Sequence, residues 1–426
     1  MATFSRSLAA GSLAVLMFLV AASARAQTQG PRRISLEEAV RLALANNPSL
    51  RAARTLIQQS QDQEITANLR PNPVLIADSL FVPLFSPGQL TSDNINTVTE
   101  FDLGASYLFE RGGKRGRRLQ AARDFTAVTS SQVADAQRAL TFSVALQYVN
   151  VLLAESTLDF ATQDLASFQN TVGISQAQYK AGQISEGDYL KIKLQLLQFQ
   201  TDVSSARLAR AQALVSLRQL LGYQSVPADY DVSGTLAYQP LTLDREHLQA
   251  LALQLRPDLR AAVQGVAASQ SQYALAKANG KQDLNFTFDY THVSGLENGS
   301  FIVNFPLPIF NRNQGEIART QAAIIQAQDS EAAARELVMS DVANSFEAAQ
   351  ADAQIIQLYQ SGYLDDAKQS RDISQYAYQR GSASLLDLLD AERSYRATQL
   401  AFLQAEAGYQ LALEQLREAV GTRRLP

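Results

Sequence analysis

The sequence predicts a mainly α-helical fold with a small β part: long antiparallel helical hairpins and two β-hairpins, arranged as an internal two-fold repeat. Three observations predict it. Residues 378–421 align without a gap on residues 179–222, and 12 of the 44 paired positions are identical, which indicates a duplicated supersecondary unit. Two stretches of about 65 residues, 115–180 and 314–379, carry helical patterns and no proline. Ahead of each long helical stretch, short segments alternate apolar and polar residues with the period of a strand.

The N-terminal 26 residues predict a secretory signal peptide. Arg6 precedes an apolar run, Leu8–Ala22, and Ala24-Arg25-Ala26 has the small-residue pattern of a cleavage site. A membrane anchor is the alternative, but the run is shorter than the roughly 18 apolar residues of a spanning helix. We therefore expect residues 1–26 to be removed and the mature chain to be exported.

Composition argues against several classes of function. Without Arg6 and Arg25 the mature chain keeps 35 of its 37 basic side chains against 41 acidic ones, which gives no reason to expect nucleic acid as a partner. The absence of cysteine excludes disulfides, a Cys-linked lipid and a Cys nucleophile. Only His247 and His292 are histidines, so we expect no cofactor, no tight metal site and no enzyme. No stretch after residue 26 resembles a transmembrane helix, so a membrane crossing would use strands.

The first repeat is predicted to span residues 27–221. Leu36, Val40 and Leu44 recur at helical spacing, and Pro71 and Pro73 end the second helix. The residues from Phe101 to Phe109 alternate as a strand does. The predicted elements are helices over 35–47 and 48–69, a hairpin over 73–109 with a long turn-rich connection, a long helix over 115–180 and a return helix over 185–221.

A linker over 222–243 leads to the second repeat, residues 244–426. The alternation of Leu284–Thr291 predicts one strand, and Phe301–Leu307 is expected to be its partner. Val338, Val342 and Phe346 begin a coiled-coil seam that continues to Ile356. The predicted elements are helices over 243–255 and from 257, a hairpin over 282–308, a long helix over 314–379 and a return helix over 384–421.

Four strands cannot cross a membrane alone. Each strand has about nine residues, the length of a tilted bilayer-crossing strand. An open sheet edge in hydrocarbon leaves unpaired backbone groups, and the smallest bacterial barrels have eight strands. Copies of the chain would therefore combine, two for eight strands or three for twelve, and this reasoning does not choose between them. The edge of a soluble sandwich is the alternative interpretation of the strands.

Several motifs resemble the TolC-like outer-membrane efflux proteins over essentially the whole mature chain. They are Ser35-Leu36-Glu37-Glu38-Ala39-Val40, Asn47-Pro48, Pro306-Leu307-Pro308-Ile309-Phe310-Asn311-Arg312, and Tyr378-x-x-Gly381 followed by Leu386-Asp387-Leu388-Leu389-Asp390-Ala391. The resemblance implies a homotrimer with a twelve-strand barrel in the outer membrane and a helical barrel in the periplasm. It also implies a periplasmic adaptor and an inner-membrane RND-type pump as partners. The Pro-Leu-Pro-Ile-Phe stretch looks most like the cobalt–zinc–cadmium branch.

The resemblance also implies roles for residues near the two predicted tip turns. In the family, two aspartates that match Asp387 and Asp390 ring the periplasmic mouth. Ser384-x-x-Asp387 is equally the pattern of a helix N-cap, so both interpretations of Asp387 stay open. Asp390 has Lys191 as its counterpart in the first repeat, so a duplicated cap does not account for it.

Asp188 and Tyr378 match positions that hold the family's mouth closed, and an ordinary contact between the tips is the alternative. The family's basic partner is replaced by Ala383, so Arg380 is the candidate substitute. The turn residues Gly182, Gln183, Gly381 and Ser382 match the tips that meet the adaptor.

The resemblance favours a passive exit duct for small molecules or metal cations. A duct for protein or peptide secretion and a periplasmic coiled-coil scaffold are the alternatives. The basic cluster that begins at Arg111 is interpreted as a collar near lipid headgroups.

Overall fold

The computed structural model describes residues 32–240 and 242–425. The predicted signal peptide lies outside the described residues. The described chain is mostly helical with a few strands, as expected. The same order of elements, two short helices, two strands, one long helical stretch and a return helix, occurs twice along it.

The elements of the first half follow the predicted order. They are α2 (Leu36–Asn46), α3 (Pro48–Ala67), β2 (Val74–Leu80), β3 (Glu100–Phe109), α5 (Lys114–Lys180) and α6 (Glu186–Leu221). Side-chain caps define two of the helix starts: Ser35 Oγ accepts from the Glu38 amide at 3.2 Å, and Ser185 Oγ accepts from the Asp188 amide at 3.1 Å. The long connection between β2 and β3 also contains a short helix, α4 (Ser92–Thr97), which the turn-rich sequence did not predict.

The second half differs from the prediction in two elements. The elements are α7 (Arg245–Leu255), α8 (Pro257–Asn279), β5 (Leu284–Val293), β6 (Leu296–Asn304), α9 (Gln314–Leu358), a π-helical turn (Tyr359–Tyr363), α10 (Leu364–Gln379) and α11 (Leu385–Val420). The expected single helix over 314–379 is therefore wrong. Gly362 has φ of 134°, which interrupts the α-helical hydrogen bonding and inserts the π-helical turn.

The partner strand is β6 (Leu296–Asn304), which contains the expected Phe301 and Val303. The expected bounds Phe301–Leu307 are wrong at both ends. Ser294 and Gly295 have φ of 55° and 72°, the conformation of a two-residue hairpin turn. That turn starts the partner strand at Leu296, which pairs with Val293. Pro306 follows the strand, and proline has no N–H to donate to a ladder, so Phe305 and Leu307 lie outside it.

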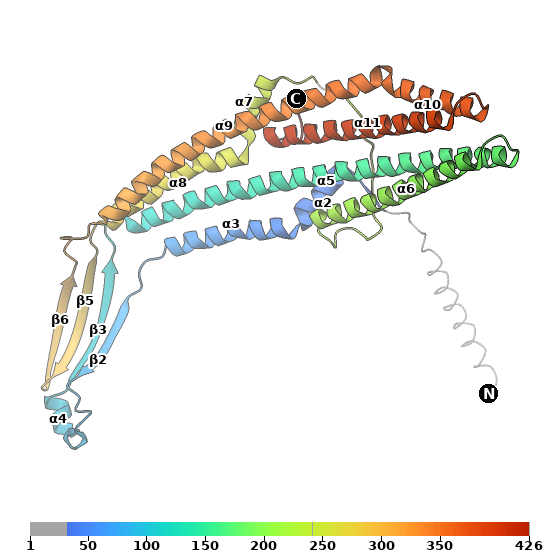
Figure 1. Cartoon of the computed structure of the whole chain (residues 1–426). Coiled ribbons are helices and arrows are strands. Elements are labelled where there is room, and N and C mark those ends of the chain that lie inside the picture. The colour runs from blue at the N-terminus through green and yellow to red at the C-terminus, as the bar shows by residue number, and fades with distance from the viewer. Residues whose placement is uncertain (1–31, 241, 426) are drawn as a thin grey trace, which may run out of the picture. The chain divides into compact units, whose positions relative to one another are not determined.

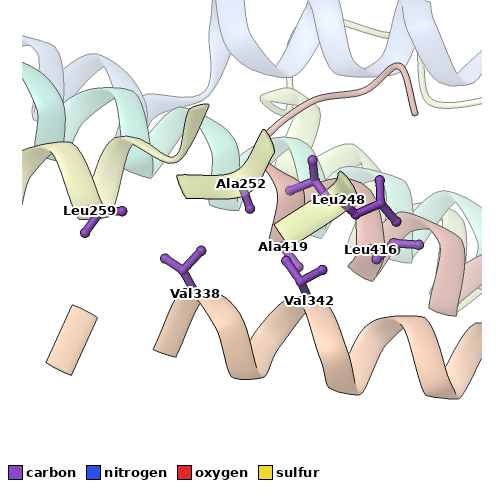
Figure 2. Close-up of a cluster of buried hydrophobic side chains, with 8 residues drawn as sticks. Leu248, Ala252, Leu259, Val338, Val342, Leu416 and Ala419 are labelled. Carbon is purple, nitrogen blue, oxygen red and sulfur yellow. The ribbon is translucent and has the colours of Figure 1, made fainter. Parts of the chain in front are cut away.

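The chain divides into two compact units. The first comprises Met1–Asn47, Thr141–Pro240 and Ala351–Leu411, of which the described part begins at residue 32; the second comprises Pro48–Leu140, Leu241–Gln350 and Ala412–Pro426. The second unit contains a core in which α7, α8, α9 and α11 meet. In Figure 2 Val338 and Val342 of α9 point toward side chains of α7 and α11, and all the residues of this core are buried. This core includes the start of the predicted coiled-coil seam.

The four long strands of the second unit form one antiparallel sheet in the order β2-β3-β5-β6 (Figure 1). Because successive residues point to opposite faces, the register separates the side chains by polarity. One face carries mainly apolar side chains, among them Leu103, Phe288 and Phe301. The other face is largely polar, with Asp102, Thr291 and Asn298 in one cross-strand row. Strands β2 and β6 are the two edges, and neither has a second partner among the described strands.

In the first unit, the linker contributes a strand that the sequence did not predict. Strand β4 (Asp231–Val232) pairs in parallel with β1 (Arg33–Ile34). The hydroxyl of Tyr148, on α5, donates to the Ile34 carbonyl at 2.9 Å. These contacts hold the segment before α2 and the linker against α5.

Each pair of short helices is joined to the end of its return helix by a matching hydrogen bond. In the first unit the Asn47 side chain donates to the Leu220 carbonyl at 2.9 Å. In the second unit the buried Arg256 donates to the Ala419 carbonyl at 3.4 Å and pairs with Asp341 at 2.7 Å. Both bonds tie the bend between two short helices to the last turn of a long one.

By length and composition, an 18-residue window of α5 is apolar enough to cross a membrane, contrary to the expectation of no such helix. A third of that window is buried inside the protein. Val144, Ala145 and Val151 of α5 are fully buried. The core helix of a folded protein can pass the same test, so passing it does not by itself show that α5 crosses a membrane.

Replacing Gly222 by alanine is expected to destabilise the protein. Gly222 has φ of +90°, and a Cβ there would lie 2.9 Å from the Asn46 carbonyl oxygen. Backbone strain of this kind costs about 1–3 kcal/mol. The matched control is Gly187→Ala on the same helix, where the nearest atom is 3.7 Å away and alanine should stabilise by about 0.5–1 kcal/mol. Thermal unfolding followed by circular dichroism measures both, and an equal midpoint for the two variants would contradict the prediction.

Candidate functional site

The two tip turns of the first unit have the same backbone geometry. Gly182 follows α5 with φ of +74°, and Gly381 follows α10 with φ of +73°. The amide of the next residue, Gln183 or Ser382, donates back to the carbonyl of Gln178 or Ala377, each at 2.9 Å. This is the arrangement of a glycine C-cap, in which a residue of positive φ satisfies the last carbonyls of the helix. The four predicted tip residues are therefore exposed at two equivalent turns.

A cavity of about 830 Å³ is lined by residues of both hairpins near these turns. Asp188, Tyr378 and Arg380 all line it, so the fold brings together three residues that the sequence singled out. Tyr378 and Asp188 are not hydrogen-bonded to each other. The Asp188 carboxylate accepts instead from Ser185 Oγ at 2.8 Å and from Lys191 Nζ at 3.4 Å.

The surroundings of these three residues differ. The bonds from Ser185 and then Lys191 lower the pKa of Asp188 below its ordinary value, because they stabilise its charged form. Tyr378 is buried, and its hydroxyl has no hydrogen-bond partner among the described residues. The guanidinium of Arg380 lies 5.2 Å from the centre of the Tyr376 ring. Tyr378 is therefore the buried donor of the cavity that remains available for a partner.

Asp387 and Asp390 lie in different local environments. The Asp387 carboxylate accepts from the Ser384 amide at 3.0 Å and from its hydroxyl at 2.7 Å, and these bonds lower its pKa. The Ser384 hydroxyl in turn accepts from the Asp387 amide at 3.2 Å, so the helix-cap geometry exists. Asp390 pairs with Arg393 at 2.7 Å, and both side chains are exposed. An exposed pair of this kind contributes little to stability, which leaves the Asp390 charge available to solvent ions.

An ionic cluster that the sequence analysis did not identify connects the two hairpins in the first unit. Arg396 of α11 lies with its Nε 2.8 Å from Asp164 Oδ2 of α5 and also pairs with Asp202 of α6. The guanidinium of Arg396 stacks over the Phe199 ring at 4.3 Å. Arg371 of α10 stacks over the Tyr395 ring at 4.2 Å. The four helices that meet at the tip turns, α5, α6, α10 and α11, therefore all contribute to one cluster.

Two carboxyl groups of this cluster are buried and strongly perturbed. Burial raises the pKa of Asp164 to about 6, although Arg396 and Arg371 oppose the shift. Burial, and then the charge of Asp164, raise the pKa of Glu392 to about 7. Glu392 is 4% exposed and forms no ion pair within the described chain. Spacing in the sequence gave no signal for this cluster, because its members come from four separate helices.

A second feature missed from the sequence is a group of aspartates on the polar face of the sheet. Asp78 and Asp102 are directly opposite each other on β2 and β3, and Asp289 of β5 faces Gly104. Like charges directly opposite in a sheet are destabilising. One oxygen each of Asp102 and Asp289 is buried without a hydrogen-bond partner among the described residues. Among residues 32–240 and 242–425, no three His, Cys, Asp or Glu side chains are arranged to hold a metal ion.

The fold and this site define a class of protein in which paired long helical hairpins carry strands with one lipid-compatible face and one polar face. A family model described as outer membrane efflux protein matches residues 39–223 and 248–422, and these two segments make up most of the chain. The chain therefore belongs to the outer membrane efflux protein family. The resemblance inferred from the sequence and the outer-membrane location that it implied are confirmed.

Two curated relatives match this chain along most of their length. The cobalt-zinc-cadmium resistance protein CzcC of Cupriavidus metallidurans is 24% identical over 391 residues, which cover 88% of this chain and 87% of the relative. The cation efflux system protein CusC of Escherichia coli K12 is 26% identical, with 95% and 91% covered.

Solved structures share the fold. A crystal structure of CusC has a TM-score of 0.75 at 23% identity and covers 93% of this chain and 95% of its own. The open state of the Neisseria gonorrhoeae MtrE outer membrane channel has a TM-score of 0.74 at 21% identity, with 91% and 89% covered. The printed names describe CusC as a cation efflux system protein and MtrE as an outer membrane channel.

Replacing Ser384 by alanine is expected to loosen the first turn of α11. The change removes the acceptor for the Asp387 amide and the donor to its carboxylate, and a lost cap costs about 1 kcal/mol. Hydrogen exchange of the amides at the start of α11, followed by mass spectrometry, should become about fivefold faster. Ser361→Ala in the π-helical turn is the control, since Ser361 caps no start of an α-helix. Unchanged exchange in Ser384→Ala would mean that Ser384 is not the cap.

Proposed function

We propose that three copies of this chain form the outer-membrane channel of a tripartite efflux system, which serves as a passive exit duct. The energy for transport comes from an inner-membrane RND-type pump, and a periplasmic adaptor connects that pump to the duct. Membership of the efflux family supports the channel role. The count of three rests on the resemblance to TolC-like proteins, because strand number alone allows two or three copies.

The observation that carries this proposal is the two-faced, four-stranded sheet. Its apolar face suits lipid, and its polar face suits a water-filled lumen. Its edges, β2 and β6, present unpaired backbone groups that hydrocarbon does not tolerate. Pairing β6 of one copy with β2 of the next satisfies both edges, and three copies then close a barrel of twelve strands.

The matching joints support a duplication of one ancestral unit. Asn47 and Arg256 occupy equivalent bends, and the carbonyls that they contact, those of Leu220 and Ala419, are equivalent in the 44-residue internal alignment. The family model also matches the chain in two segments. Each copy has two long helical stretches and two return helices. Three copies would then place six of each around one tunnel, with approximate six-fold repetition.

We propose metal cations as the cargo. The printed names of CzcC and CusC refer to cobalt, zinc, cadmium and cations, whereas the relative SrpC of Pseudomonas putida is named for solvent efflux. The aspartates of the polar sheet face favour the cation alternative, because clustered carboxylates raise the local concentration of cations. Asp78, Asp102 and Asp289 would line the lumen of the barrel, three from each copy.

The tips are proposed to form the mouth and the docking surface. Asp387 and Asp390 of three copies would converge on the axis of the tunnel. Asp188, Tyr378 and Arg380 would regulate its opening, with the unpaired Tyr378 hydroxyl accepting or donating a bond in one of the states. The exposed turns that contain Gly182, Gln183, Gly381 and Ser382 would meet the adaptor.

Replacing Asp390 by asparagine is expected to reduce the preference of the channel for cations. The change removes one charge per chain at the mouth while keeping the size of the side chain, and the exposed pair with Arg393 adds little stability. The ratio of potassium to chloride permeability in planar bilayers should fall severalfold, with conductance unchanged or higher.

The control is Asp329→Asn, an exposed aspartate of α9 in the other unit, which should leave the permeability ratio unchanged. A permeability ratio in Asp390→Asn equal to that of the wild type would remove Asp390 from the mouth. Recovery of the mature protein in the soluble periplasmic fraction, without channels in bilayers, would contradict the channel itself and favour a scaffold.

A further inference from the structure

The ionic cluster of the first unit connects two hairpins that are otherwise joined by few polar contacts. One hairpin consists of the distal part of α5 and α6, and the other of α10 and α11. Besides the cluster, Gln375 donates to the Thr171 hydroxyl at 2.9 Å, and Gln178 donates to the Gln379 carbonyl at 3.1 Å. An apolar core that contains Phe168, Ile192 and Leu388 lies beside them. The cluster is the only group of charges in the described residues of this unit that draws on all four helices.

The charges of the cluster do not balance. Arg371 and Arg396 supply two positive charges. The carboxyl groups that face them are Asp164 on α5, Asp202 on α6, Asp372 on α10 and Glu392 on α11. Arg396 is shared between Asp164 and Asp202, Arg371 pairs with Asp372, and Glu392 has no ion pair among the described residues. Asp164 and Glu392 are therefore the two buried carboxyls that the arginines do not fully compensate.

The local geometry supports the same conclusion. Neither oxygen of Asp164 accepts a well-aligned hydrogen bond, although Arg396 lies 2.8 Å away. Glu392 is buried beside a small cavity of about 230 Å³ that Phe199 and Arg396 also line. Asp390 and Arg393 line the same cavity and pair with each other at 2.7 Å. The ring of Tyr395 packs against Phe160 and Arg371. An ionised carboxylate in such a place is disfavoured, whereas a protonated one loses little.

We propose that Asp164 and Glu392 form a proton-binding site that couples the pairing of the two tip hairpins to the pH of the periplasm, with the hairpins held together most firmly when both carboxyls are protonated. This proposal rests on the proposed function, since it adds a regulation to the opening of the same mouth. Movement of α10 has a structural basis in the π-helical turn before it, where Gly362 interrupts the helix.

The direction of the effect follows from proton linkage. Both carboxyls have a raised pKa while the hairpins are paired, about 6 for Asp164 and about 7 for Glu392, against ordinary values of 3.8 and 4.5 when they are exposed. The paired state therefore binds protons that the separated state does not, so pairing strengthens as pH falls from 8 to 6 and weakens as pH rises through about 7. From pH 6 to pH 8, the ratio of separated to paired hairpins should rise about tenfold through Glu392 and about twofold through Asp164.

The test compares the wild type with Glu392→Gln, which is permanently neutral and of the same size. Single-channel recordings in planar bilayers measure the ratio of open to closed states at pH 6, 7 and 8. Hydrogen exchange of α10 and α11 amides, corrected for the intrinsic effect of pH, measures the pairing without reference to conduction. In the wild type the ratio of open to closed states and the corrected exchange rate should each rise about twentyfold per protomer from pH 6 to pH 8. In Glu392→Gln the mouth should stay largely closed at pH 8, and the rise should drop to about twofold.

The control variant is Glu186→Gln, an exposed carboxylate in the first turn of α6, which should keep the full pH response. A Glu392→Gln protein with an unchanged response to pH, or one shifted equally at every pH, would overturn the proposal. If the protein conducts at no pH but its exchange still follows pH as described, the channel function fails and the proton site stands. Channels whose opening and exchange are both independent of pH would sink the proton site alone.

Discussion

The constraint on which the rest of the structure depends is the open four-stranded sheet. Strands β2 and β6 each have one edge without a partner among the described strands, and in a bilayer no water is available to pair with it. Apolar and polar side chains lie on opposite faces of the sheet, so neither water alone nor lipid alone suits both faces. In the assembly that we propose, identical copies would remove both difficulties together, because edge would meet edge while the apolar faces turn outward. That proposed arrangement would also bring the sheet aspartates of several chains into one lumen.

The helical part works under a different constraint, since long helices need continuous packing to remain paired. The second unit meets it with a core of buried aliphatic side chains around Val338 and Val342. The first unit, near the tips, relies on fewer apolar contacts together with the buried charges around Arg396. Charges are more costly to bury than aliphatic groups and are sensitive to their surroundings. Interactions of this second kind suit the mouth that we propose at the tips, because that mouth would have to open.

Much of the fold could be predicted from the sequence, because hydrophobic periodicity and helix-capping or helix-breaking residues act locally. Ser35, Ser185 and Pro48 marked helix starts, and alternation marked the strands. The π-helical turn was not predictable, since Gly362 lies in an otherwise uninterrupted helical pattern and its effect depends on packing. At the site, Gly182 and Gly381 were found because a turn requires them. The Asp164–Arg396 cluster was missed because its members, 232 positions apart in the sequence, meet only after the hairpins pair.

The most direct measurement of the central claim is disulfide cross-linking between the edge strands. The chain has no cysteine, so variants with one cysteine in β2 and one in β6 carry no background. Within one sheet these edges are three strand spacings apart, about 14 Å, which is beyond the reach of a disulfide. A scan of positions near Ala77 and Phe301, which lie on the same face of the sheet, should give, at the matching register, covalent dimers and trimers in denaturing gels after oxidation in membranes. Monomer at every register would contradict an assembly closed by these edges.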